Sequence, residues 1–328
     1  MTPVLQESIT VNVCVLGATG FIGQHLVERL ISLGYAVSVL SRSEPDVARV
    51  RFPTKSVRWT VGDWNDQCKL AEAMAGADIC FHLICTMLPR SSNEDPIHDV
   101  TSNVCGTIRV LETALASGCR KVVFASSGGT IYGAPQSIPI AEFHPLEPNN
   151  SYGISKLAIE KYMKLFFNLH GLEYGIARLS NPYGEAQATD RAQGAVSVFL
   201  HRALTYKPIE IWGDGSIVRD YLYIADAVDG LIKVANYAGI ERIFNIGSGR
   251  GLSLLDIVNE IETLLNRKVS VRHAAGNQFD VPINILSIDR AINVLGFQPK
   301  VPFKAGLQRT AQWHQSYGRR AMEAISGD

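Results

Sequence analysis

The feature that most constrains this chain is a glycine-rich turn between a buried-strand pattern and a helix pattern. The apolar run VNVCVLG (11–17) leads into GATGFIG, which places glycines at 17, 20 and 23. A helical stretch follows and reaches its capping glycine at Gly34. Glycines in such a turn let the backbone approach a pyrophosphate, and the helix N-terminus supplies free N–H groups and positive dipole. The sequence therefore predicts a dinucleotide site at the first βα turn.

Short apolar runs alternate with helical patterns over the first half of the chain. These runs are apolar on both faces, as in parallel strands covered by two layers of helices. They span 11–17, 36–40, 56–63, 77–83, 121–127 and 172–179. The rhythm predicts an α/β fold with a Rossmann-type doubly wound parallel sheet over residues 1–179.

The second half has a looser pattern. Residues 180–328 are expected to form a smaller α/β substrate-binding domain, with a segment near 243–249 returning to the main sheet. Helices are expected near 194–205, 225–236, 253–266 and 303–317.

Composition narrows the possible partners. The 328 residues include 31 Lys plus Arg and 31 Asp plus Glu, so the formal net charge is zero. This balance argues against nucleic-acid binding and against attraction to anionic membranes. The six cysteines form no CxxC motif and the eight histidines form no HxH or HExxH motif, so neither disulfides nor a metal site is expected. Without a signal-peptide pattern or a long apolar stretch, the chain is expected to be cytoplasmic, with no membrane span.

The second strand leaves the choice of cofactor open. An acidic residue at its end usually binds the ribose 2′-OH of NAD, whereas Ser41 and Arg42 stand at this place. The Arg42 guanidinium could accept the 2′-phosphate of NADP, but a solvated arginine at a strand end explains the residue equally well. Asp63, after the third strand, is placed to meet the adenine edge.

A tyrosine and a lysine lie one helical turn apart in SYGISKLAIEKY (151–162), so Tyr152 and Lys156 point the same way. A free phenol has a pKa of about 10 and is a poor base at neutral pH. An ammonium group nearby, together with the positive nicotinamide of an oxidised cofactor, would favour the phenolate and lower this pKa. The pair therefore predicts a catalytic base, although a helical surface pair has the same spacing.

With the glycine turn and the YxxxK motif, the chain resembles the extended short-chain dehydrogenase/reductase family. The segments FASSGGTIYG (124–133), RLSNPYG (178–184) and IEIWGDGSIVRDYLYIADAVDGL (209–231) follow in order, and the last two resemble substrate-domain motifs of nucleotide-sugar 4-epimerases and dehydratases. The resemblance implies one NAD or NADP per chain and a nucleotide-sugar substrate. The expected cofactor contacts are Gly17, Thr19, Gly20, Phe21, Ile22, Gly23, Ser41, Arg42, Asp63, Trp64, Leu83, Asn103, Tyr152 and Lys156.

The same resemblance assigns the catalytic roles. Tyr152 would take the proton from a sugar hydroxyl, and Lys156 would also bind the nicotinamide ribose. Family members usually carry a serine or threonine at the position that Gly128 occupies here, four residues before the tyrosine of the YG pair. Ser127 or Thr130 would then supply the hydroxyl, with Ser127 preferred; both could instead only cap a strand end.

Four positions match the substrate side of the family. Asn181 and Arg219 are expected to hold the nucleotide diphosphate, since an arginine fork suits phosphate. An ion pair with a neighbouring aspartate is the other interpretation of Arg219. Trp212 would stack on a base or pack the domain interface. Asp280 is retained, but Asn277 stands where the family often has a further arginine.

Two reactions fit these residues. The first is 4-epimerisation of a nucleotide sugar, most simply a UDP-sugar, by transient oxidation with bound NAD. The second is reduction of a nucleotide-4-keto-sugar by NADPH, which Arg42 favours. Dehydration is disfavoured because Gly128 and Gly129 replace the Asp–Glu pair of such enzymes. A catalytically silent NADP-binding regulator is disfavoured by the intact Tyr152 and Lys156.

Family members commonly pair through two long helices, for which 103–117 and 152–170 are the candidates. In the second, Leu157, Tyr162, Leu165 and Phe166 cannot all face one sheet, so some apolar surface is expected to remain. This predicts a homodimer, unless loops of the same chain cover these side chains.

Overall fold

The computed structural model describes residues 10–45, 50–189, 194–275 and 281–325. Within them, seven parallel strands form one sheet in the order β10-β6-β5-β4-β1-β2-β3. The strands are β1 (Asn12–Leu16), β2 (Ala36–Ser41), β3 (Val57–Val61), β4 (Ile79–His82), β5 (Lys121–Ser127), β6 (Glu173–Leu179) and β10 (Ile243–Ile246). The order reverses at β1, which confirms the doubly wound Rossmann sheet.

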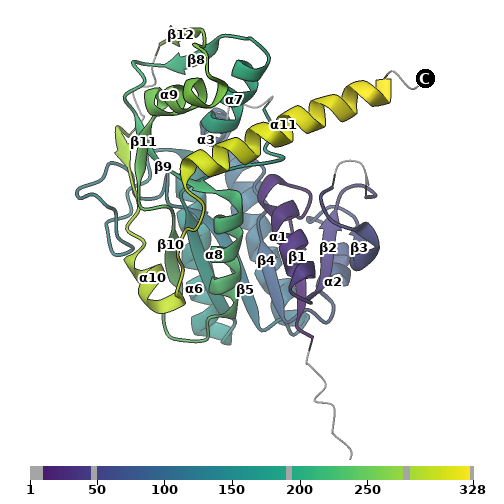
Figure 1. The fold of residues 1–328 in the computed structure, drawn as a ribbon. Helices are drawn as coiled ribbons and strands as arrows, with labels where there is room; N and C mark the ends of the chain where they lie inside the picture. Colours follow the sequence, from purple (N-terminus) through teal and green to yellow (C-terminus); the bar gives the residue numbers. More distant parts are fainter. Residues whose placement is uncertain (1–9, 46–49, 190–193, 276–280, 326–328) are drawn as a thin grey trace, which may run out of the picture.

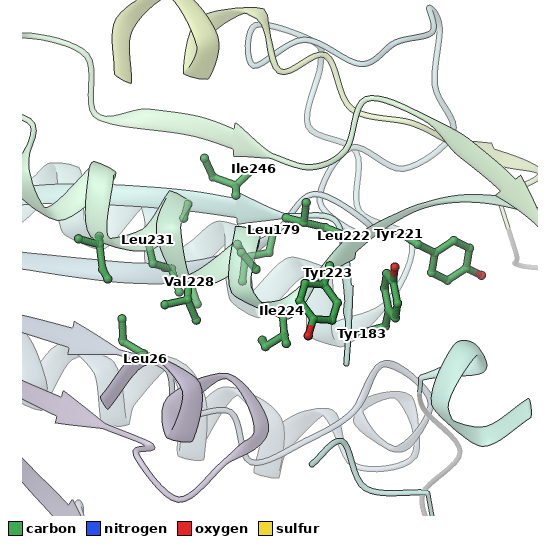
Figure 2. Packing of buried hydrophobic residues seen from close by; sticks show 14 of the residues in the cluster. Leu26, Leu179, Tyr183, Tyr221, Leu222, Tyr223, Ile224, Val228, Leu231 and Ile246 are labelled. Carbon is green, nitrogen blue, oxygen red and sulfur yellow. The ribbon is translucent and has the colours of Figure 1, made fainter. Parts of the chain in front are cut away.

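Helices cover both faces of this sheet (Figure 1). The core beside α1 (Phe21–Ser32) and α8 (Ile224–Asn236) is separate from the core beside α2 (Gln67–Met74), α5 (Gly106–Ala116) and α6 (Ser151–His170). In the first core, Val228 and Leu231 of α8 lie with Leu26 of α1 and Ile246 of β10 (Figure 2). Except in the edge strand β3, alternate residues of each strand enter the two cores, which is why these strand sequences are apolar on both faces.

The remaining elements gather mainly at one end of the sheet (Figure 1). Strand β9 (Val218–Tyr223) pairs with β7 (Asn181–Tyr183), β11 (Gly251–Ser253) and β13 (Ile283–Asn284), while β8 (Ile209–Trp212) pairs with β12 (Val271–Ala274). The helices of this part are α7 (Ala195–Leu204), α9 (Leu254–Leu265), α10 (Asp289–Leu295) and α11 (Phe303–Ile325). A division at residue 179 stays a proposal, since β10 joins the first sheet from beyond it.

Three short elements connect β4 to α5. They are α3 (Pro89–Glu94), α4 (Pro96–Asp99) and the π-helical turn η2 (Val100–Cys105), and all three pack against α6. The expected helix over 103–117 therefore begins as a π-helix and becomes α-helical only at Gly106. Another short turn, η1 (Thr54–Ser56), precedes β3. No helix among the described residues is long and apolar enough to span a membrane.

The apolar residues of α6 divide between the core and the surface. Phe166 is only 8% exposed and belongs to the core between α6 and the sheet, and Tyr162 packs against the same core. The expectation that some apolar surface remains on this helix is confirmed, because Leu165 is 44% exposed. Ile154 and Leu169 are exposed as well, and they share one helical face with Leu165.

Candidate active site

The glycine turn between β1 and α1 is closed too tightly for side chains. Gly17 has a φ of +89°, and a Cβ on Gly23 would lie 2.1 Å from the Gly17 carbonyl oxygen. A Cβ on Gly17 would lie 3.2 Å from the carbonyl carbon of Leu83. Helix α1 begins after Gly20 with no side-chain cap, so no side chain competes with an anion for its first N–H groups. The turn therefore fits a pyrophosphate.

The flanking residues of this turn differ in exposure. Thr19 is exposed, whereas Phe21 and Ile22 are half-buried and pack against the core. At the end of β2, Ser41 is buried and Arg42 is exposed. Arg42 is thus accessible to a ligand, but its exposure does not distinguish NAD from NADP.

The other expected cofactor residues all have partners within the protein. Asp63 is exposed and accepts hydrogen bonds from the backbone and side chain of Asn65 at 2.8 and 2.7 Å. The ring of Trp64 is buried in the core, where a Cβ on Gly106 would lie 2.4 Å from it, so a cofactor contact by Trp64 would have to come from its backbone. Asn103 accepts from the backbone N–H of Thr86 at 3.0 Å.

The first turn of α6 is capped by its own N-cap residue and by two residues of α3. The side chain of Asn150 accepts from the Gly153 N–H at 2.8 Å. From α3, Ser92 accepts from the Tyr152 N–H at 3.0 Å and Asn93 accepts from the Ser151 N–H at 2.9 Å. These bonds satisfy three N–H groups that a helix start leaves without partners, and they fix the turn that carries Tyr152.

Lys156 lies beneath Tyr152, on the same side of α6. It is 5% exposed, and its ammonium donates to the Ala125 carbonyl at 2.9 Å. The ammonium also lies 4.5 Å from the centre of the Phe124 ring and 5.6 Å from that of Tyr152. The predicted juxtaposition of phenol and cation is present, at the carboxyl end of β5.

The pKa of Tyr152 differs from what the sequence predicted. Burial raises the pKa of Tyr152, although a hydrogen bond with Ser127 lowers it. Burial lowers the pKa of Lys156. The expected lowering of the Tyr152 pKa by Lys156 is therefore outweighed by desolvation, because the ammonium is directed toward Ala125 rather than the phenol oxygen.

The hydroxyl beside Tyr152 belongs to Ser127, which acts to lower the pKa of the phenol. The Thr130 hydroxyl is buried and has no partner among the described residues. A Cβ on Gly128 would lie 2.5 Å from the Leu286 side chain, so Leu286 fills the space that a serine or threonine would need. This explains the departure from the family pattern, and the geometry favours Ser127 over Thr130.

Two further residues of this site belong to no recognisable sequence motif. The Cys85 side chain interacts with Tyr152, and Asp99 accepts a hydrogen bond from Ser155 at 2.7 Å, next to Lys156. A cysteine in ICTMLP and an aspartate in DPIHDV look like ordinary loop and helix residues. Only the helical spacing of Asp99 and Asn103 hints that the two share a face.

The expected substrate residues lie on the second part of the chain. Asn181 donates to the Asp220 carbonyl at 3.0 Å, and its amide oxygen lies near Gly129. Trp212 donates to Glu210 at 2.9 Å on the separate β8–β12 ribbon. Asp280 and Asn277 lie outside the described residues.

Arg219 donates to the Val281 carbonyl at 2.6 Å. The carboxylates that could have paired with it accept other donors: Asp220 binds the backbone of Ser248 and Gly249, and Asp226 binds the backbone of Lys300 and Val301. Both carboxylates are therefore held by backbone N–H groups.

Comparison with known proteins identifies the family. The model of the NAD dependent epimerase/dehydratase family matches residues 13–247. The chain belongs to this family. It is 32% identical over 92% of its length to the UDP-glucose 4-epimerase of Mycolicibacterium smegmatis, covering 98% of that protein. It is 34% identical over 91% of its length to a dTDP-4-dehydro-6-deoxyglucose reductase of Escherichia coli, covering 96% of it.

A solved structure of this epimerase/dehydratase family has the same fold. The UDP-glucose 4-epimerase of Thermus thermophilus, in complex with NAD, superposes with a TM-score of 0.85 and 29% identity. The match covers 93% of this chain and 99% of the other.

Proposed function

We propose that this protein is a nucleotide-sugar 4-epimerase, acting on a UDP-sugar by transient oxidation at C4 with bound NAD. The observation that carries the proposal is the cluster of Tyr152, Ser127 and Lys156 at the carboxyl end of the sheet that also presents the glycine turn. Epimerases among the relatives, one of them solved with NAD, support it.

The chain's residues divide the proton chemistry among them. Tyr152 accepts the proton of the sugar 4-OH at its phenol oxygen, and the Ser127 hydroxyl acts on the same group. A bound NAD would supply the hydride acceptor and donor for C4, and its positive ring would favour the phenolate. Lys156 holds positive charge beneath the phenol ring, in a place that also suits a contact with the nicotinamide ribose.

On the substrate side, we propose that Asn181 and Arg219 hold the nucleotide diphosphate and that Trp212 contacts the base. Asn181 supports this because its amide oxygen lies near Gly129, in the loop that follows the catalytic Ser127. Asp280 stays part of the proposed set.

The competing function is reduction of a nucleotide-4-keto-sugar by NADPH. The exposed Arg42 and the reductase relative favour it. Incubating the pure protein with UDP-glucose or UDP-N-acetylglucosamine separates the two. We expect 4-epimerisation, detected by NMR of the products, without added cofactor. Consumption of NADPH only in the presence of a keto sugar would favour the reductase, and no reaction with any nucleotide sugar would favour a silent regulator.

Arg42 gives a direct test of cofactor choice. If its guanidinium accepts the 2′-phosphate of NADP, Arg42→Ala should weaken NADP binding by about tenfold or more, as expected for a charged hydrogen bond. NAD binding should change by less than about threefold by the same reasoning. Calorimetric titration of the wild type and of Arg42→Ala with NAD and with NADP measures these changes in affinity. Equal losses for NAD and NADP would contradict a 2′-phosphate role.

We also propose a homodimer in which α5 and α6 of each subunit form an isologous four-helix bundle. Ile154, Leu165 and Leu169 leave 53%, 44% and 64% of their surface exposed on one face of α6. Ile97, at 81%, stands exposed on the neighbouring α4. Apolar side chains gathered in this way are typical of an interface.

Light scattering at micromolar concentration should therefore give the mass of a dimer. Leu165→Glu combined with Leu169→Glu should give a monomer, because four carboxylates would face one another across the two-fold axis. Ile240→Glu is the matched control, since Ile240 is 85% exposed and lies before β10. A monomeric wild-type protein would refute the dimer.

We propose a cytoplasmic location because the thiols of this chain are free. All six cysteines are unpaired, and Cys14, Cys80 and Cys119 are buried. Free thiols of this kind are typical of a reducing compartment.

A further inference from the structure

The first turn of α6, which carries Tyr152 and Lys156, is hydrogen-bonded to a single buried carboxylate. Asp99 is fully buried at the end of α4. Its Oδ2 accepts hydrogen bonds from the hydroxyl of Ser151 at 2.8 Å and from that of Ser155 at 2.7 Å. These serines immediately precede Tyr152 and Lys156, so the carboxylate is bonded to both neighbours of the reacting pair.

The other oxygen of Asp99 connects this turn to the loop after β4. Asp99 Oδ1 accepts from the amide of Asn103 at 2.8 Å, and Asn103 in turn accepts from the Thr86 N–H at 3.0 Å. Thr86 follows Cys85, whose side chain interacts with the Tyr152 phenol. One carboxylate therefore joins the two chain segments that flank Tyr152.

No charged group donates a hydrogen bond to Asp99 within the described residues. Its three donors are two hydroxyls and an amide, all neutral, and it forms no ion pair within the described parts of the chain. A buried charge acts over several ångströms because little water screens it. The carboxylate therefore acts on both groups of the catalytic pair.

We propose that Asp99 is a positioning residue with two effects. It fixes the catalytic turn, and it places a negative charge near Tyr152 and Lys156 as these groups gain and lose protons. This inference rests on the proposed function, since it concerns the same two side chains. It extends that function because Asp99 touches neither sugar nor cofactor in the proposed mechanism.

The direction of the electrostatic effect follows from the groups that face the pair. Burial raises the pKa of Tyr152, and the Cys85 thiol and the Asp99 carboxylate raise it further, against a hydrogen bond from Ser127. Burial lowers the pKa of Lys156, against the opposing effects of Cys85, Asp99 and Glu160. The buried His82, whose pKa is lowered by burial to about 3, is neutral at working pH. Removing the Asp99 charge therefore lowers both pKa values.

The test compares the pH dependence of epimerisation in the wild type, Asp99→Asn and Asp99→Ala. Asp99→Asn keeps the size and an oxygen for the serines but removes the charge, so the whole pH profile should move to lower pH by about one unit, the scale of one nearby buried charge. Asp99→Ala also removes the hydrogen bonds from Ser151, Ser155 and Asn103. Its kcat should therefore fall at least tenfold below that of Asp99→Asn, with KM unchanged.

Asp95→Asn is the matched control. It removes a charge from the same segment, but Asp95 is exposed and caps α4 by accepting from the His98 N–H at 2.9 Å. Its pH profile should match that of the wild type. A wild-type profile in Asp99→Asn would overturn the electrostatic role, and equal kcat in Asp99→Asn and Asp99→Ala would overturn the positioning role.

A second readout does not depend on turnover. Ionisation of Tyr152 can be followed by tyrosinate absorbance in the presence of NAD, as the difference between each variant and the same variant carrying Tyr152→Phe. The midpoint should be lower in Asp99→Asn than in the wild type by about one unit, for the same reason. If no nucleotide sugar reacts, the proposed function fails, while this titration still decides the role of Asp99: an unchanged midpoint overturns it.

Discussion

Replacing Tyr152 with phenylalanine is expected to lower kcat for epimerisation by about 10²- to 10⁴-fold, the range of a lost general base. The ring would still fill its place above Lys156, which lies 5.6 Å from the ring centre. Only the oxygen that accepts the sugar proton would be missing. The loss should therefore appear in kcat, whereas calorimetric binding of NAD should stay within about threefold of the wild-type value.

Tyr162→Phe provides the control for this experiment. Tyr162 lies on the same helix, half-buried against the core and remote from the first turn. Its loss of a hydroxyl should leave kcat unchanged. Wild-type activity in Tyr152→Phe would remove Tyr152 from the mechanism, and an equal loss in both variants would indicate damage to the helix instead.

Replacing Arg178 with methionine is expected to lower the free energy of unfolding by about 3–5 kcal/mol, the usual cost of leaving one partner of a buried ion pair uncompensated. Arg178 and Glu160 are 1% and 4% exposed and meet through two bonds of 2.7 and 3.1 Å. Arg178 also donates to Tyr132 at 3.0 Å, and Ser126 donates to Glu160 at 2.6 Å. The pair thus holds β6, α6 and the end of β5 together beneath the catalytic residues.

Urea unfolding followed by circular dichroism measures this loss. The control is Arg120→Met, which breaks the exposed pair of Arg120 with Asp78 and should cost less than about 1 kcal/mol. In the double variant with Glu160→Gln, part of the stability should return, because no unpaired charge then stays buried. Similar losses in Arg178→Met and Arg120→Met would contradict a structural role for the buried pair.

Local sequence patterns were sufficient to predict those features of the structure that depend on a single strand or a single helical turn. Strands apolar on both faces predicted the parallel sheet because every strand except the edge strand β3 contributes to two cores. The spacing of Tyr152 and Lys156 predicted that they share a side of the helix. Gly34, with a φ of +83°, is the capping glycine that the pattern indicated after α1.

Contacts between distant segments could not be predicted in this way. The space beside Gly128 is filled by Leu286, which no local pattern links to it. The burial of Asp99 depends on how the segment between β4 and α5 folds over α6. A helix pattern shows which side chains share a face, but not how wide a face the neighbours cover, so it predicted leftover apolar surface on α6 without showing that Leu165 is exposed and Phe166 buried.

The most direct test of the central claim follows the hydrogen on C4. UDP-glucose carrying deuterium at C4 should be converted to its 4-epimer with the deuterium retained, because the hydride that leaves C4 returns to it within one site. Mass spectrometry and NMR of the product measure the retention. Epimerised product that has exchanged its deuterium for solvent hydrogen would contradict transient oxidation at C4 with bound NAD.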